Sequence, residues 1–156
     1  MKIAMIVRSF LTSPVPSDVA YSPTSVAIAI AEGLAAKGHA ITFFGPEGTS
    51  IPQITIETNG VRPLANNKQE LFALTSTNDL FQDYIPSLFD QFMAKDMFER
   101  ASRGEFDVLM FHHPESAMGY AKLYPTVPVV YVVHDYLDEK RRQVIEMHHS
   151  VNQHFV

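Results

Sequence analysis

Short apolar segments that alternate with helix-like segments constrain this chain more than any other feature of its sequence. The apolar segments span residues 3–7, 40–44, 106–111 and 127–133. An apolar run without period-two alternation is typical of a strand that is buried on both faces of a parallel sheet. Because helix-like segments separate these runs, the sequence predicts an α/β fold with an open, mostly parallel sheet and right-handed crossover connections.

The helix-like segments differ in how clearly their ends are marked. The segment 25–37 is apolar on most of its circumference, so we expect more than one side of this helix to be covered. Ser22 or Thr24 is a candidate N-cap, and Gly38 is a candidate C-terminal stop. Shorter helices are predicted over 67–76, 115–123 and 138–149.

The strongest helical periodicity lies near the middle of the chain. Apolar side chains recur there at spacings of three and four, at Phe81, Tyr84, Ile85, Leu88, Phe89, Phe92 and Met93. The pattern continues to about residue 101, and Pro86 inside it means that the helix either kinks there or begins at Ser87. Such a stripe is more often part of a core than a lipid-binding groove.

Two weaker strand signals complete the pattern. Residues 54–58 alternate between apolar and polar side chains, which predicts a half-exposed or edge strand. Phe155 and Val156 resemble the first residues of a further strand. A domain rarely ends where a strand begins, so we expect residues 1–156 to be one domain of a longer protein.

Length and composition exclude several classes of protein. A chain of 156 residues supports one hydrophobic core, and the absence of cysteine excludes disulfide scaffolds, zinc–thiolate sites, iron–sulfur clusters and a cysteine nucleophile. The net charge of −5 argues against a nucleic-acid partner, which needs a clustered positive face. The first apolar run ends at Arg8, too early for the roughly 20 residues of a membrane span. We therefore expect a soluble, cytoplasmic protein.

Three of the seven histidines follow predicted strands directly. In a parallel α/β sheet, ligands bind in the crevice beyond the carboxyl ends of the strands. That edge, which we call the rim, should bring together the segments 8–24, 112–115 and 134–136. The histidines in these segments are His112, His113 and His134. The rim is therefore the predicted binding site.

Four segments form a series in a specific order: the strand at 1–7 with the turn at 21–24, the helix-to-strand passage at 30–44, the strand and histidines at 106–114, and the strand with its His-Asp pair at 129–135. Together they resemble the amino-terminal half of family-four retaining glycosyltransferases. The resemblance implies one half of a GT-B fold, in which two Rossmann-like three-layer domains face each other across a cleft. Residues 1–156 would be the acceptor-side domain, and the carboxyl-terminal donor-binding domain would lie outside this chain.

The resemblance also implies a reaction: a sugar moves from a nucleotide-sugar to an unknown small-molecule or glycan acceptor with retention. His112 matches the family histidine near the anomeric centre, which hydrogen-bonds the sugar and stabilises developing positive charge. No metal or cofactor is expected, because helix N-termini and cationic side chains of the second domain can neutralise the diphosphate. The isolated domain should turn over poorly. Further substrate-binding candidates are Arg8, Tyr21, Ser22, Thr24, His113, Glu115, His134 and Asp135.

One departure from the family pattern supports other hypotheses. The family has two adjacent glycines in the loop after the first strand, whereas this chain has no glycine between Met1 and Gly33. A non-catalytic, flavodoxin-like module that binds an anion or a partner is therefore an alternative. A third hypothesis is a metal-dependent hydrolase with His112, His113, His134 and Asp135 as ligands. Two of the candidate binding residues also have simpler interpretations. Arg8 can be an ordinary surface arginine, and His134 can pair with Asp135 at a turn without contacting a substrate.

Overall fold

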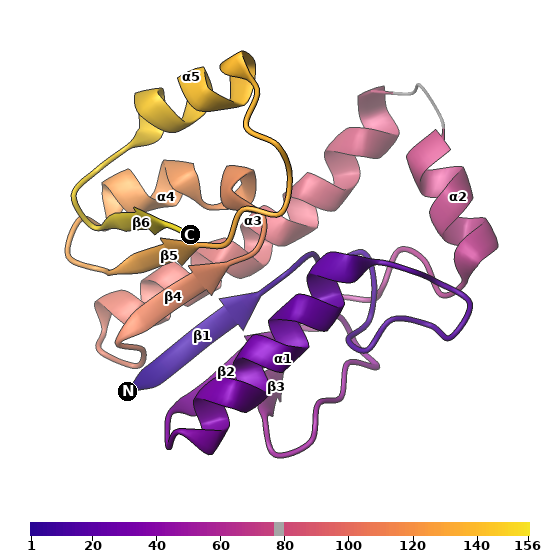
Figure 1. Ribbon diagram of the computed structural model, residues 1–156, viewed down its shortest axis with the longest axis horizontal. Coiled ribbons are helices and arrows are strands. Elements are labelled where there is room, and N and C mark those ends of the chain that lie inside the picture. Colours follow the sequence, from indigo (N-terminus) through magenta and orange to yellow (C-terminus); the bar gives the residue numbers. More distant parts are fainter. Residues whose placement is uncertain (77–79) are drawn as a thin grey trace.

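The computed structural model describes residues 1–76 and 80–156, and within these it describes all side chains except those of 80–85. Six strands form one sheet in the order β3-β2-β1-β4-β5-β6, and every pair of neighbours is parallel (Figure 1). The strands are β1 (Lys2–Ile6), β2 (Ala40–Phe44), β3 (Thr55–Glu57), β4 (Val108–Phe111), β5 (Val129–Tyr131) and β6 (Gln153–Phe155). The predicted α/β fold with a parallel sheet is confirmed.

The strand order is that of a Rossmann fold. The chain builds the sheet outward from β1 to β3, returns to the other side of β1 with β4, and continues outward to β6. A flavodoxin-like sheet has the order 2-1-3-4-5, so the flavodoxin-like topology of the alternative hypothesis is wrong. The reversal of direction creates a switch point between β1 and β4, the place where ligands bind in folds of this kind.

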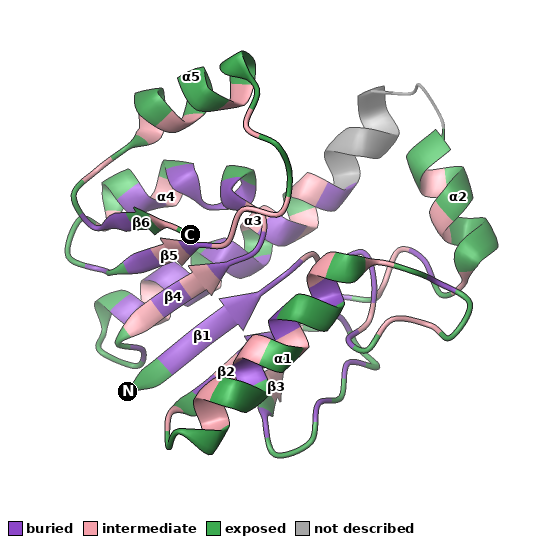
Figure 2. Cartoon of the chain, viewed as in Figure 1, coloured by how far each residue is buried: buried purple, intermediate pink, exposed green. Residues whose placement is uncertain are grey.

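Helices cover both faces of the sheet and complete three layers. They are α1 (Ser22–Ala36), α2 (Lys68–Ser76), α3 (Leu80–Ser102), the short 3₁₀ helix η1 (Pro114–Ser116), α4 (Met118–Leu123) and α5 (Glu139–His148). Side chains alternate between the faces of a strand, so Ile3 and Met5 pack against α1, while Ala4 and Ile6 belong to the core beneath α3 and α4. The four inner strands β2, β1, β4 and β5 are largely buried, whereas α2 and α5 are largely exposed (Figure 2).

The start and the surroundings of α1 differ from the prediction. The helix begins at Ser22, so Tyr21 occupies the N-cap position and makes no side-chain capping bond, and the predicted N-caps Ser22 and Thr24 are wrong. Pro23 lies in the first turn, where no amide hydrogen is needed. Only the sheet-facing side is buried, and Val26 is 42% exposed. The second cover that we expected is absent in the described residues, because a loop without a helix connects β2 to β3.

The end of α1 confirms the predicted stop at Gly38. The backbone of Gly38 has a φ of 85°, in the left-handed region that favours glycine. The Gly38 amide donates to the carbonyl of Ala35 at 2.8 Å, and the His39 amide donates to the carbonyl of Leu34 at 3.2 Å. These two bonds are the pair that defines a Schellman motif, which satisfies the last carbonyls of a helix.

The helix α3 continues through Pro86, so the alternative in which it begins at Ser87 is wrong. Its periodic stripe divides between two surroundings: Met93 is completely buried in the core, whereas Phe92 is 54% exposed. The side chains of Phe81, Tyr84 and Ile85 lie outside the described residues. Among the helices in the described part of the chain, none combines the length and the apolar character that a membrane crossing needs.

The minor strands also follow the prediction in part. The strand β3 is half-exposed and forms one edge of the sheet, as the alternation at 54–58 predicts. The strand β6 lies at the other edge and begins at Gln153 instead of Phe155. Its polar first residue, which is buried, hides the start of the strand from a search for apolar runs.

Two glycines near the same helix end provide a matched test of the Schellman motif. Replacing Gly38 by Ala should lower the free energy of unfolding by about 1–2 kcal/mol, because a Cβ atom is unfavourable in the left-handed region. Gly33→Ala should instead raise it by about 0.5–1 kcal/mol, since Gly33 is exposed inside the helix and has open space at its Cβ position. Urea unfolding would measure both, and equal effects would contradict the assigned helix end.

Candidate functional site

The candidate site lies at the switch point, where the exits of β1 and β4 stand side by side. The amide of His112 donates to the carbonyl of Ile6 at 3.0 Å, which extends the hydrogen-bonded ladder between the two strands beyond β4. His112 therefore has a backbone position fixed by the sheet, unlike a residue in the middle of a loop. Arg8 leaves β1 on the other side of the same switch point.

His112 and His134 form a direct pair at this rim. Nδ1 of His112 lies 2.8 Å from Nε2 of His134, and the two ring planes are only 19° apart. This distance and near-coplanarity are those of a hydrogen bond between the two imidazoles. His112 is only 5% exposed, and its other ring nitrogen, Nε2, is buried without a hydrogen-bond partner in the described residues. One buried polar atom of the pair is therefore without a partner in the described residues.

Burial keeps this pair uncharged near neutral pH. Burial and, to a smaller extent, the neighbouring His134 lower the pKa of His112 to about 4. Burial also lowers the pKa of His134, while the negative charge of Asp135 opposes that effect. At pH 7 His112 is a neutral imidazole, so it can act on a ligand through hydrogen bonds and carries no positive charge of its own.

A buried carboxylate that we did not predict, Asp90 on α3, holds the exit of β1. Asp90 is completely buried and accepts hydrogen bonds from the amide of Ser9 at 2.7 Å and from its hydroxyl at 2.6 Å. Its second oxygen lies 2.6 Å from Nε of Arg8 in an ion pair that is not aligned as a hydrogen bond. The sequence contains a signal for this role, because Asp90 shares the core-facing side of the helix with Ala94 and Met97.

A second ionic network connects the exits of β4 and β5 to α5. Nε2 of His113 lies 3.5 Å from Glu115, whose carboxylate receives two contacts from Arg141, at 2.9 and 2.7 Å. Arg141 also lies 3.5 Å from Asp135. His134 and Asp135 are thus bound to His112 and Arg141 respectively, and the simple pair between them that we considered is not formed.

Tyr21 lies at the same rim, whereas the side chain of Thr24 is buried. Burial raises the pKa of the Tyr21 hydroxyl, and the charges of Arg8, Asp90 and Asp135 all act on it. Tyr21 and Arg8 line a cavity of about 370 Å³ together with residues of α2 and α3. Thr24 is only 3% exposed, while Ser22 is exposed. The rim thus brings together the predicted residues other than Ser22 and Thr24, and their roles in binding remain predictions.

The four proposed metal ligands do not converge on one point. Within residues 1–76 and the described side chains of 86–156, no group of three or more His, Cys, Asp or Glu is arranged to hold a metal ion. His112 and His134 instead use their facing nitrogens for each other. The metal-dependent hydrolase hypothesis therefore has no support from the geometry of this part of the chain.

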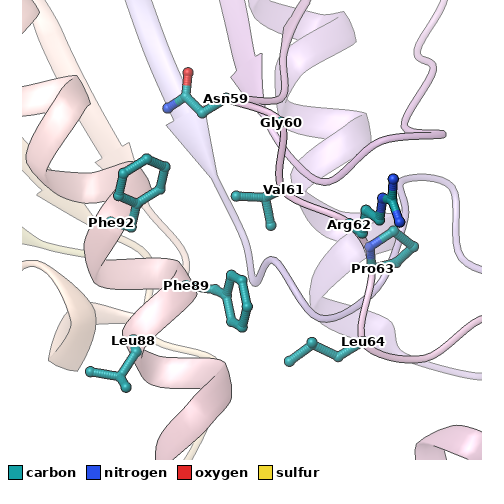
Figure 3. Close-up of a pocket in the computed structure, with 9 residues that line it drawn as sticks. All are labelled: Asn59, Gly60, Val61, Arg62, Pro63, Leu64, Leu88, Phe89 and Phe92. Carbon is teal, nitrogen blue, oxygen red and sulfur yellow. The ribbon is translucent and has the colours of Figure 1, made fainter.

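A larger, apolar groove lies apart from the histidine pair (Figure 3). It has a volume of about 670 Å³ and separates the loop after β3 from α3. In Figure 3, Phe89 and Phe92 face the loop that carries Val61 and Leu64. None of the predicted site residues lines this groove, and the helix stripe at 81–101 is the sequence signal that accounts for its apolar wall.

Comparisons with known proteins give little beyond this geometry. No family model matches the chain, and no curated protein matches it. Among solved structures, MurG of Acinetobacter baumannii is similar with 14% sequence identity and a TM-score of 0.40. The similarity covers 92% of this chain and 39% of the MurG chain. A likeness this remote carries no argument about function, so the function must be inferred from the residues themselves.

Removing the Asp90 carboxylate should destabilise the protein strongly. Asp90→Ala leaves Arg8 and the Ser9 donors without their partner, and breaking a buried ion pair of this kind costs about 3–5 kcal/mol. The matched control is Asp96→Ala on the same helix, whose 3.5 Å ion pair with Arg100 is partly exposed and contributes about 1 kcal/mol or less. Denaturant unfolding of both variants decides the matter, and similar losses would show that Asp90 has no special role.

The neutral state of His112 should make stability depend on pH. Its folded-state pKa of about 4 is below the ordinary 6.5, so this contribution is fully present above pH 6.5 and is lost as the pH falls towards 4. The difference corresponds to about 3 kcal/mol. Unfolding of the wild type and of His112→Gln between pH 7 and 4 should show a weaker pH dependence for the variant, with exposed His149→Gln as the control. Parallel curves would contradict the assignment.

Proposed function

We propose that residues 1–156 are the amino-terminal, acceptor-side domain of a retaining glycosyltransferase. In this proposal a sugar moves from a nucleotide-sugar to a small-molecule or glycan acceptor in the cleft between this domain and a carboxyl-terminal donor-binding domain. The proposal rests on the resemblance of the four sequence segments and on one structural observation. That observation is a buried, neutral His112 at the switch point with Nε2 free of partners in the described residues.

The state of His112 suits the role that the resemblance implies. Positive charge develops on the sugar as the phosphate leaves, and a cationic imidazole beside it would repel that charge. Because burial keeps His112 neutral, its ring can hydrogen-bond the sugar without this penalty. The ladder bond to Ile6 fixes the backbone below the ring, so little reorganisation is needed when the sugar arrives.

The other rim residues have supporting roles in this proposal. Arg8 is committed to Asp90 through Nε, so we propose that it orients the exit of β1 and contacts an anionic group only with the remaining edge of its guanidinium. Tyr21, which lines the 370 Å³ cavity, and the exposed Ser22 that follows it in the chain supply hydroxyl groups. Arg141, which the sequence did not indicate, anchors Glu115 and Asp135 next to His113. No metal or cofactor has a place in the proposal.

A non-catalytic anion- or partner-binding module is the second candidate, and the N-terminus of α1 favours it. The loop before α1 contains no glycine, Pro23 removes one amide donor from the first turn, and Thr24 is buried. A phosphate can therefore approach fewer backbone amides there than at a glycine-rich loop. Such a module would bind its ligand at the rim without transferring a sugar.

Sugar transfer by the two-domain protein tests the proposal. We expect it to hydrolyse or transfer at least one nucleotide-sugar in a screen, and we expect His112→Ala to lower kcat by about 10²–10³-fold, the usual effect of losing one stabilising hydrogen bond in a transition state. The acceptor KM should change much less. The control is His149→Ala, at the exposed end of α5. An unchanged rate in His112→Ala would refute its role, and binding without any turnover would favour the non-catalytic module.

A further inference from the structure

The hydrogen bond between His112 and His134 restricts which ring nitrogens can carry a proton. The facing nitrogens, Nδ1 of His112 and Nε2 of His134, are 2.8 Å apart, so one of them must donate and the other must accept. A neutral imidazole has one N–H and one bare nitrogen, whereas a protonated imidazole has two N–H groups. The proton on one ring therefore determines the hydrogen-bonding character of the other.

When His134 is neutral, Nε2 of His112 should be the bare nitrogen. Nε2 is buried and has no acceptor in the described residues, and an unpaired buried N–H is the rarer and less favourable case. His134 is more exposed than His112, so its own N–H can reach water at Nδ1. The pair then consists of His112 Nδ1–H donating to His134 Nε2, and the buried Nε2 of His112 is an acceptor.

When His134 is protonated, the arrangement must reverse. Both nitrogens of His134 then carry hydrogen, so Nε2–H points at His112, and Nδ1 of His112 must accept. As a neutral ring, His112 can keep its single proton only at Nε2. The same atom that accepted a hydrogen bond now donates one, although His112 itself has not changed its charge.

Charged groups around the pair act on His134 more than on His112. Asp135, on the same loop, favours the charged form of His134. Arg141 of α5 lies 3.5 Å from Asp135. Across the rim, Arg8 and Asp90 form their own ion pair beside His113. His134 is thus the member of the pair that is protonated first as the pH falls, while His112 is the more deeply buried ring.

We propose that His134 is a positioning residue whose protonation converts Nε2 of His112 from a hydrogen-bond acceptor into a donor. The geometry of the pair carries this inference, and only its consequence for catalysis rests on the proposed function. A sugar hydroxyl would donate to His112 when His134 is neutral, and a sugar or phosphate oxygen would accept from His112 when His134 is charged. The pair thereby selects which ligand atom His112 contacts.

Nitrogen NMR of the histidine rings in the 156-residue chain tests the inference without any sugar transfer. As the pH falls from 7, and before His112 itself titrates near its pKa of about 4, we expect Nε2 of His112 to change from a bare to a protonated nitrogen, with the same midpoint as the titration of His134. In His134→Phe and in His134→Gln that change should disappear, because neither side chain titrates. The control His149→Phe, exposed at the end of α5, should preserve it.

Two results would overturn the inference: an Nε2 of His112 that stays in one state while His134 titrates, or a change that persists in both His134 variants. The second variant guards against misfolding of the first. In the two-domain protein, the pH profile of kcat should lose one ionisation in His134→Gln. If the NMR change is present but no sugar is transferred, the proposed function fails while this inference stands.

Discussion

The burial of one carboxylate, Asp90, determines how the rest of the rim is built. A fully buried carboxylate is stable only when its oxygens are matched by donors or positive charge, and here the donors come from Ser9 and the charge from Arg8. These contacts connect α3 to the exit of β1, because Ser9 and Asp90 meet although they lie 81 residues apart in the sequence. Asp90 holds Arg8 directly. It also holds His112 indirectly, because the amide of His112 is hydrogen-bonded to Ile6 at the end of β1.

The rim combines rigid placement with little net charge at its deepest point. His112 is fixed by the sheet below it and by His134 beside it, and burial keeps it neutral. Charged residues surround this centre in pairs, Arg8 with Asp90 and Arg141 with Glu115. A ligand therefore meets a neutral ring among compensated charges, an environment suited to hydrogen bonding to a sugar more than to holding a free phosphate or a metal ion.

The helices and strands of this fold could be predicted well from the sequence, whereas the contacts between distant elements could not, for physical reasons. Apolar runs identified β1, β2, β4 and β5, because strands buried on both faces must be apolar throughout. The apolar pattern alone could not predict the strand order, since the same βα pattern fits both a Rossmann and a flavodoxin-like sheet, and only the family resemblance implied the Rossmann-like arrangement that the structure has. The role of Asp90 was not predicted, because it depends on a hydrogen bond with Ser9, which lies 81 residues away in the sequence. The pairing of His112 with His134 likewise depends on neighbouring strands whose adjacency the pattern does not reveal.

The switch point has a consequence for how the protein acquires its site. No continuous stretch of the chain contains the rim, because the segments that follow β1 and β4 meet only when these two strands pair across everything that lies between them. Closing so long a loop is entropically costly and belongs to the slow, non-local part of folding. The rim therefore exists only where β1 and β4 have paired, and a fragment that lacks either strand does not contain it.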